Sequence, residues 1–210
     1  MKKILYALLT LVLGLVLSSS GCSTTVDPFD PGIYDEGVTI NGVKWATRNV
    51  DAVGKFAANA GSAGMFYQWN IKKAWPATGP ITGTWPTTPA GGTTWAASND
   101  PCPDSWRVPT KAECESLVAA TVTKTWGTSH GKNGHWFGTA SEPYLLFLPV
   151  TGYRWETVLY EEVDRGTYWS STGTGEPGDA PTMDFQYPNY FLKHSSAHKA
   201  CGLPVRCVKK

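Results

Sequence analysis

The chain has 210 residues, with 18 basic and 17 acidic side chains and a formal net charge of +1. This balance, without a basic stripe, excludes the electrostatic footprint of a protein that binds nucleic acid. Ten tryptophans, 22 glycines and 15 prolines stand beside only 17% charged residues. Such a composition favours short strands joined by long ordered loops and excludes a helical bundle.

Residues 1–21 have the order of a secretory signal: two lysines, an apolar run from Ile4 to Leu17, and then small residues. The run is shorter than the roughly 20 apolar residues that span a bilayer. Cys22 follows directly, as in bacterial lipoproteins, in which the cysteine thiol is acylated after cleavage. We therefore predict a protein of the bacterial cell envelope, lipid-anchored through Cys22 in the outer membrane. A cleaved, secreted protein and a retained anchor helix are the alternatives.

The mature chain begins with a predicted tether. Residues 22–37 are acidic, rich in Pro and Gly, and free of basic side chains, which predicts a flexible segment. The predicted domain, residues 38–210, starts with a hairpin. Asn41 and Gly42 separate two short strand-like segments, and both positions of such a turn require positive φ.

Two segments of different character follow the hairpin. Residues 64–75 are apolar and aromatic, and their periodicity does not decide between strand and helix. Residues 76–101 form a long stretch of Thr, Gly and Pro that carries Trp85 and Trp95. A loop of this length is usually functional or disordered, and the two tryptophans argue against disorder.

Residues 110–120 are the clearest predicted helix. Thr110 is a good N-cap and Glu113 stands three residues later, which is the pattern of a capping box. After Gly127, short apolar segments separated by Gly and Pro predict strands near 136–137, 144–150, 153–155, 168–170, 183–185 and 205–208. The predicted fold class is α+β, a looped antiparallel sheet with one or two short helices.

Four cysteines remain besides Cys22. Outside the cytoplasm an even number of cysteines indicates disulfides, and four residues allow three pairings. We favour the nested pairing, Cys102–Cys207 with Cys114–Cys201. The spacing does not match zinc sites, whose cysteine pairs lie two to four residues apart.

Several spaced segments resemble one protein family. CPDSWRVPT at 102–110, YWSST at 168–172 and VRCV at 205–208 resemble three signatures of the Fibrobacter succinogenes major paralogous domain. FYQW at 66–69 and LPVTGYR at 148–154 are similar to its Bacteroidetes branch. The resemblance covers residues 38–210. It implies a C-type-lectin-like fold, distantly similar to the formylglycine-generating type, in which a disulfide joins the first helix to the last strand; this supports Cys102–Cys207.

Aromatic rings on loops suggest a binding platform, because flat rings stack on sugars. Our candidates are Trp85, Trp95, Tyr187 and Tyr190. The alternative is that these rings fill a core that is short of aliphatic residues.

Calcium is the one cofactor for which the sequence offers ligands. Glu176, Asp179 and Asp184 supply three carboxylates, the ligand type that calcium prefers. The Glu-Pro-Asn and Trp-Asn-Asp motifs of calcium-binding C-type lectins are absent, so a solvated acidic loop is the alternative. No other cofactor is predicted.

The sequence does not indicate a catalytic site. The G-x-x-x-x-G-K-[ST] phosphate-binding loop is absent. We interpret His130, His135, His194 and His198 as ordinary loop histidines, and the cysteines as structural rather than as a reactive pair. The predicted function is a binding or adhesion module of the cell envelope whose partner is a glycan or a surface protein. The alternatives are a non-catalytic structural subunit of a fimbrial or polysaccharide-uptake assembly and, less favoured, an enzyme related to the formylglycine-generating fold.

Overall fold

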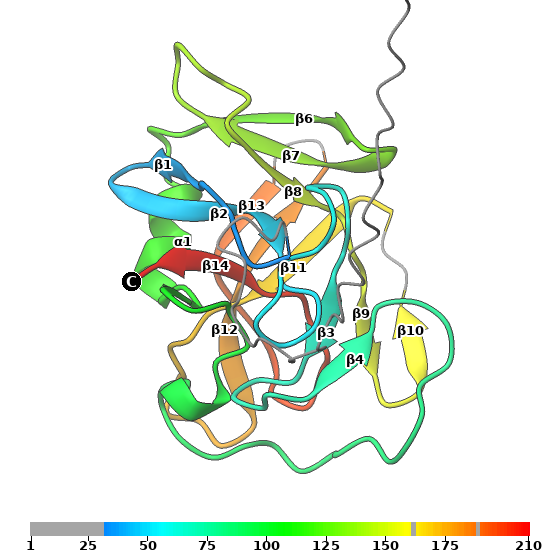
Figure 1. The fold of residues 1–210 in the computed structure, drawn as a ribbon. Coiled ribbons are helices and arrows are strands. Elements are labelled where there is room, and N and C mark those ends of the chain that lie inside the picture. Colours follow the sequence, from blue (N-terminus) through cyan, green and yellow to red (C-terminus); the bar gives the residue numbers. More distant parts are fainter. Residues whose placement is uncertain (1–31, 161–162, 188–189) are drawn as a thin grey trace, which may run out of the picture.

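The computed structural model describes residues 32–160, 163–187 and 190–210, without the side chains of residues 190–194, and strands predominate in this part of the chain (Figure 1). They form five small antiparallel sheets, accompanied by one short α-helix and a 3₁₀ turn at Ala97–Asn99. The described residues thus form mostly small antiparallel sheets with one short helix, which is compatible with the predicted α+β class. The strands are β1 Val38–Ile40, β2 Val43–Asn49, β3 Met65–Tyr67, β4 Ala74–Pro76, β5 Trp106–Arg107, β6 Thr123–Ser129, β7 Lys132–Gly138, β8 Leu146–Pro149, β9 Tyr153–Trp155, β10 Val158–Tyr160, β11 Arg165–Trp169, β12 Asp179–Gln186, β13 Tyr190–His198 and β14 Arg206–Lys209.

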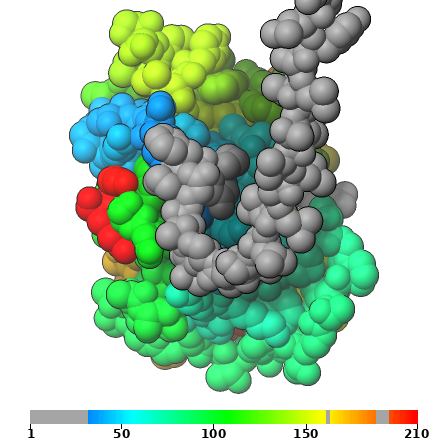
Figure 2. Space-filling view, in the orientation of Figure 1, coloured from blue at the N-terminus to red at the C-terminus, as the bar shows by residue number. Residues whose placement is uncertain are grey.

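The largest sheet joins the two ends of the domain in the order β1-β2-β14-β5. The predicted hairpin is confirmed, because β1 pairs with β2 and the turn between them has φ of 48° at Asn41 and 78° at Gly42. β14 then pairs with β2 along its other edge. In Figure 2 the blue hairpin and the red C-terminal strand accordingly meet on one surface.

The helix α1, Lys111–Leu117, has the predicted capping box. Thr110 Oγ1 accepts a hydrogen bond from the Glu113 backbone N–H, and the Glu113 carboxylate accepts one from the Thr110 N–H. The two terminal nitrogens of the Arg107 guanidinium, Nη2 and Nη1, also donate to the Glu113 carboxylate, at 2.6 and 2.8 Å. Burial alone would raise the pKa of Glu113, but the bonds from Arg107 and Thr110 outweigh it and lower that pKa. The ionised carboxylate therefore fixes the start of α1 against β5.

One of the two predicted disulfides is present. Cys102 and Cys207 are bonded, and this bridge ties the segment before α1 to strand β14. The second predicted bridge is not formed, since Cys114 and Cys201 are buried free thiols. The physical reason is their placement, because Cys114 packs under α1 in one hydrophobic cluster and Cys201 packs in another.

Tryptophan rings fill much of the core. Trp45, Trp69, Trp75 and Trp169 are all fully buried. The indole N–H of Trp69 donates to the Ser170 carbonyl and that of Trp169 to the Tyr67 carbonyl, at 2.9 and 2.6 Å. These rings thus pin the FYQW and YWSST segments to each other. Residues 64–75, whose structure the pattern left open, contribute the β3–β4 hairpin.

Several polar segments are more ordered than the sequence predicted. His135 lies fully buried in β7 and His198 ends β13, so neither is a loop histidine. Residues 32–37, assigned to the flexible tether, lie against the domain. The buried carboxylate of Asp35 accepts hydrogen bonds from the Thr47 backbone and hydroxyl, and it forms an ion pair with Arg48.

Candidate ligand-binding site

A cavity of about 240 Å³ lies on the sheet β11-β12-β13. Side chains alternate along these strands, so Tyr168 and Phe185 point into a hydrophobic cluster. Thr167 and Asp184, which are direct partners across β11 and β12, both line the cavity instead. Strand β9 and the chain after β13 complete its wall. The lining residues are Tyr153, Arg165, Thr167, Asp184, Ser196, Ala197, His198, Cys201 and Leu203.

Asp184 is the central polar residue of this cavity. Its carboxylate forms an ion pair with Arg165, and its Oδ2 accepts a hydrogen bond from Ser195 Oγ at 2.9 Å. The other oxygen, Oδ1, is buried and has no hydrogen-bond partner in the described part of the chain. A buried acceptor without a partner costs about 1–3 kcal/mol, which a bound donor group would recover.

Two rings, those of Tyr153 and His198, line the cavity, and each packs against an aromatic ring of the β9–β10 hairpin. Tyr153 stacks on Tyr160 with ring centroids 4.9 Å apart and planes inclined by 8°. Trp155 meets the His198 ring edge-on at 5.1 Å. Tyr153 and Tyr160 are partners across the β9–β10 hairpin, as are Trp155 and Val158. The hairpin therefore presents flat apolar surface next to a carboxylate and a guanidinium.

The cavity also contains a thiol that is a poor nucleophile. Burial raises the pKa of Cys201 to about 11, and the nearby charge of Asp179 acts in the same direction. Burial likewise raises the pKa of the Cys114 thiol. Both thiols are protonated at neutral pH, whereas catalytic cysteines have a lowered pKa and partial exposure. The geometry thus offers binding groups and no activated cysteine pair.

The predicted tryptophan platform is wrong. Trp85 is 7% exposed and Trp95 is 8% exposed, and each belongs to a different hydrophobic cluster. The Trp85 N–H donates to the Ala200 carbonyl at 3.0 Å, and the Trp95 N–H donates to the Asn99 carbonyl at 2.9 Å. Their rings attach the long loop to a core short of aliphatic residues, which is the alternative weighed above.

The two tyrosines of the predicted platform lie elsewhere. Tyr187 is exposed at the end of β12 and packs edge-on against Trp126 of β6 at 5.1 Å. Tyr190 begins β13, and its side chain lies outside the described part of the structure. Tyr187 does not line the cavity around Asp184.

The three predicted calcium ligands are not brought together. Asp184 is buried in the cavity, whereas Asp179 is exposed and Glu176 lines a separate cleft. Across residues 32–160, 163–187 and 190–210, excluding undescribed side chains, no three His, Cys, Asp or Glu residues are grouped to hold a metal ion. The predicted calcium site is therefore wrong. Asp179 and Asp184 stand near opposite ends of β12, and Glu176 lines the separate cleft.

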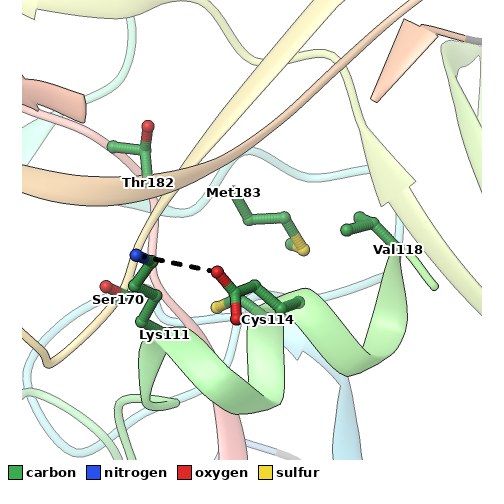
Figure 3. Close-up of a pocket in the computed structure, with 7 residues that line it drawn as sticks. Lys111, Cys114, Val118, Ser170, Thr182 and Met183 are labelled. Atoms are coloured by element: carbon green, nitrogen blue, oxygen red, sulfur yellow. Dashed lines mark ion pairs between the residues drawn. The ribbon is translucent and has the colours of Figure 1, made fainter. Parts of the chain in front are cut away.

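A smaller cavity lies between α1 and β12 (Figure 3). Its volume is about 10 Å³, enough for roughly one water molecule. Cys114, Val118 and Met183 face one another in it, and the Lys111–Glu115 ion pair at 3.7 Å lies at its side. It is too small for a ligand, so the cavity around Asp184 is the better candidate.

Sequence reasoning named Asp184 but missed its partners. The sequence predicted Tyr153 only as part of a strand, and Arg165 and Thr167 precede the strand predicted near 168–170. One signal was available, since a carboxylate between Met183 and Phe185 in an apolar strand indicates a buried charge that needs a partner. The identity of that partner depends on strand pairing, which the sequence does not state.

The predicted lipidation residue, Cys22, lies outside the described residues. Within the part of the chain that the structure covers, no helix has the length and apolar character needed to cross a bilayer. Comparison with protein-family models, with curated proteins and with solved structures found no match to the chain.

Proposed function

We propose that this protein is a lipid-anchored component of the bacterial cell envelope whose domain binds a neutral glycan in the cavity around Asp184. The observation that carries the proposal is a cavity that combines the Arg165–Asp184 ion pair with the aromatic ring of Tyr153. The Cys22 motif supports the anchor. The spaced motifs support the resemblance to the Fibrobacter succinogenes major paralogous domain and its C-type-lectin-like fold.

The groups of the cavity fit a polyhydroxyl ligand. The charges of Arg165 and Asp184 cancel in their ion pair, so the pair offers hydrogen-bond donors and an acceptor without a net charge. A sugar hydroxyl would donate to the Asp184 carboxylate, and the guanidinium would donate to a neighbouring hydroxyl. Tyr153 supplies the apolar ring surface that binding sites combine with a few placed polar groups.

The size of the cavity limits what it holds. Its volume of about 240 Å³ lies below the range of about 300–1,000 Å³ typical of sites for drug-sized ligands. One sugar ring, at the end or within a glycan, fits this space better than a folded peptide segment.

The test is a glycan array probed with the purified full-length chain and with Asp184→Asn, each with calcium and with a chelator. We expect the wild-type chain to bind a class of neutral glycans in both conditions, and Asp184→Asn to lose that binding. Asp179→Asn is the matched control, because this carboxylate lies on the same strand, is exposed and does not line the cavity. Equal binding by Asp184→Asn, shown to be folded by its melting curve, contradicts the proposed site. Absence of all glycan binding by the wild type contradicts the function and favours a structural subunit.

A further inference from the structure

A second cleft, of about 470 Å³, lies between residues 89–93 of the long loop and residues 175–178. Its lining consists of four glycines, two prolines, Thr93, Glu176 and Lys199. The two walls are held at fixed positions. The Gly173 N–H donates to the Thr93 carbonyl at 2.7 Å, and the Thr174 hydroxyl donates to the Asp179 carbonyl at 3.1 Å.

Lys199 forms the floor of this cleft and joins both walls. The residue is only 1% exposed, and its Nζ lies 3.3 Å from the Gly92 carbonyl and 3.2 Å from the Glu176 carbonyl. The ammonium also sits 4.6 Å from the centroid of the Trp69 ring. A buried ammonium with these partners sets the width of the cleft, so the cleft is part of the fold rather than a gap between loose loops.

The second cleft adjoins the cavity around Asp184. His198 lines that cavity and is the direct partner of Asp179 across β12 and β13, whereas the next residue, Lys199, lines the cleft. The Lys199 N–H donates to the Gly178 carbonyl at 2.8 Å. A methyl group at position 178 would lie 3.6 Å from His198 Cδ2, in ordinary contact. One layer of side chain and backbone thus separates the two spaces.

We infer that the ligand is a linear oligosaccharide that extends across both spaces, with one sugar unit beside Asp184 and another in the cleft over Lys199. The inference rests on the proposed glycan-binding function. Both spaces carry one cationic and one anionic residue, Arg165 with Asp184 and Lys199 with Glu176, which suits a neutral chain rather than a polyanion. Backbone carbonyls and amides in the cleft provide hydrogen-bond partners for hydroxyl groups along such a chain.

The experiment is a calorimetric titration of the full-length chain with glucose, mannose and N-acetylglucosamine and with their linear oligomers of increasing length. We expect affinity to rise about tenfold or more from the monosaccharide to the oligomers of one series. In Thr93→Trp an indole would fill part of the cleft, and we expect this variant to keep the monosaccharide affinity and to lose the gain with length. Thr87→Trp is the matched control, an exposed position of the same loop outside the cleft, and it should behave as wild type.

The outcomes separate the two claims. Binding of a monosaccharide with no gain from longer oligomers overturns the inference and leaves the proposed function standing. A gain with length that Thr93→Trp retains, at an unchanged unfolding midpoint, also overturns it, because the added contacts then lie elsewhere. No binding of any sugar by the wild-type chain defeats the inference together with the proposed function.

Discussion

Arg165 of β11 forms an ion pair with Asp184 of the neighbouring strand β12, and the two side chains differ in exposure, at 40% and 2%. The carboxylate is thus buried at the cavity while its counter-charge reaches solvent. Thr167 lies directly opposite Asp184, and Ser195 donates to the same carboxylate from β13. Three strands therefore cooperate to hold one charged group at the floor of the candidate site.

Removal of Arg165 should destabilise the fold more than removal of the whole pair. We expect Arg165→Leu to lower the free energy of unfolding by roughly 1–3 kcal/mol, because the carboxylate then stays buried without its cation. The double variant Arg165→Leu/Asp184→Leu should recover part of that loss, as apolar replacements of buried pairs often do. Denaturant unfolding of both variants checks this. If the double variant is less stable than Arg165→Leu, an unpaired Asp184 carboxylate does not destabilise the fold.

Thiol mapping should find one disulfide and two free cysteines in the domain. After unfolding without reductant, we expect alkylation of Cys114 and Cys201, and alkylation of Cys102 and Cys207 only after reduction. Because the bridge spans 105 residues, Cys102→Ala/Cys207→Ala should lower stability by about 5 kcal/mol in the chain-entropy model. Detection of a Cys114–Cys201 peptide pair would contradict the placement of these two residues.

Trp85→Ala should unfold the protein at much lower denaturant concentration. The ring is buried beside Trp75, with centroids 4.7 Å apart, and it bonds the Ala200 carbonyl. Loss of a buried tryptophan typically costs about 3–5 kcal/mol. Tyr187→Ala, at an exposed position where the ring packs edge-on against Trp126, is the control and should cost no more than about 1.5 kcal/mol. A Trp85→Ala variant of unchanged stability would restore the ring as a surface platform.

His135 should make the fold sensitive to mild acid. Burial lowers its pKa from the ordinary 6.5 to about 4; the charge of Lys124 acts in the same direction, and a hydrogen bond with the Gln186 backbone opposes it. The His135 imidazole is therefore protonated near pH 6.5 in the unfolded chain, but only near pH 4 in the folded chain. The stabilising contribution is complete above pH 6.5 and is lost as pH falls toward 4, by up to about 3 kcal/mol.

Unfolding curves across this pH range measure the effect. His135→Gln removes the titrating group, so its free energy of unfolding should fall less steeply from pH 6.5 to 4 than that of the wild type. The carboxylates titrate equally in both proteins, so their contribution cancels when one pH profile is subtracted from the other. Parallel pH profiles for the two proteins would mean that His135 is not held neutral.

Local signals in the sequence predicted local structure. The Asn41–Gly42 turn and the Thr110–Glu113 capping box depend on residues a few positions apart, and both are present as predicted. The Cys102–Cys207 bridge followed from the family resemblance together with the even number of cysteines.

Long-range structure was less accessible to sequence reasoning. Strand β6, Thr123–Ser129, is polar apart from Trp126 and shows no apolar alternation that would predict it. The burial of Trp85 depends on a contact with Ala200, more than a hundred positions away. The cavity around Asp184 likewise needs the order β11-β12-β13, since Arg165 and Asp184 become neighbours only through strand pairing.

Cys201 offers the most direct test of where the glycan binds, because this thiol lines the cavity at 9% exposure and needs no substitution. The measurement is the rate of its alkylation at mildly alkaline pH, with and without a saturating glycan identified on the array. Cys114, buried under α1, is the internal reference in the same spectrum. Because a bound ligand also disfavours unfolding, the Cys114 rate measures the protection that comes from global stabilisation. The account predicts that bound glycan slows Cys201 about tenfold or more relative to Cys114. A glycan that binds the protein without altering the Cys201 rate would show that the cavity around Asp184 is not the binding site.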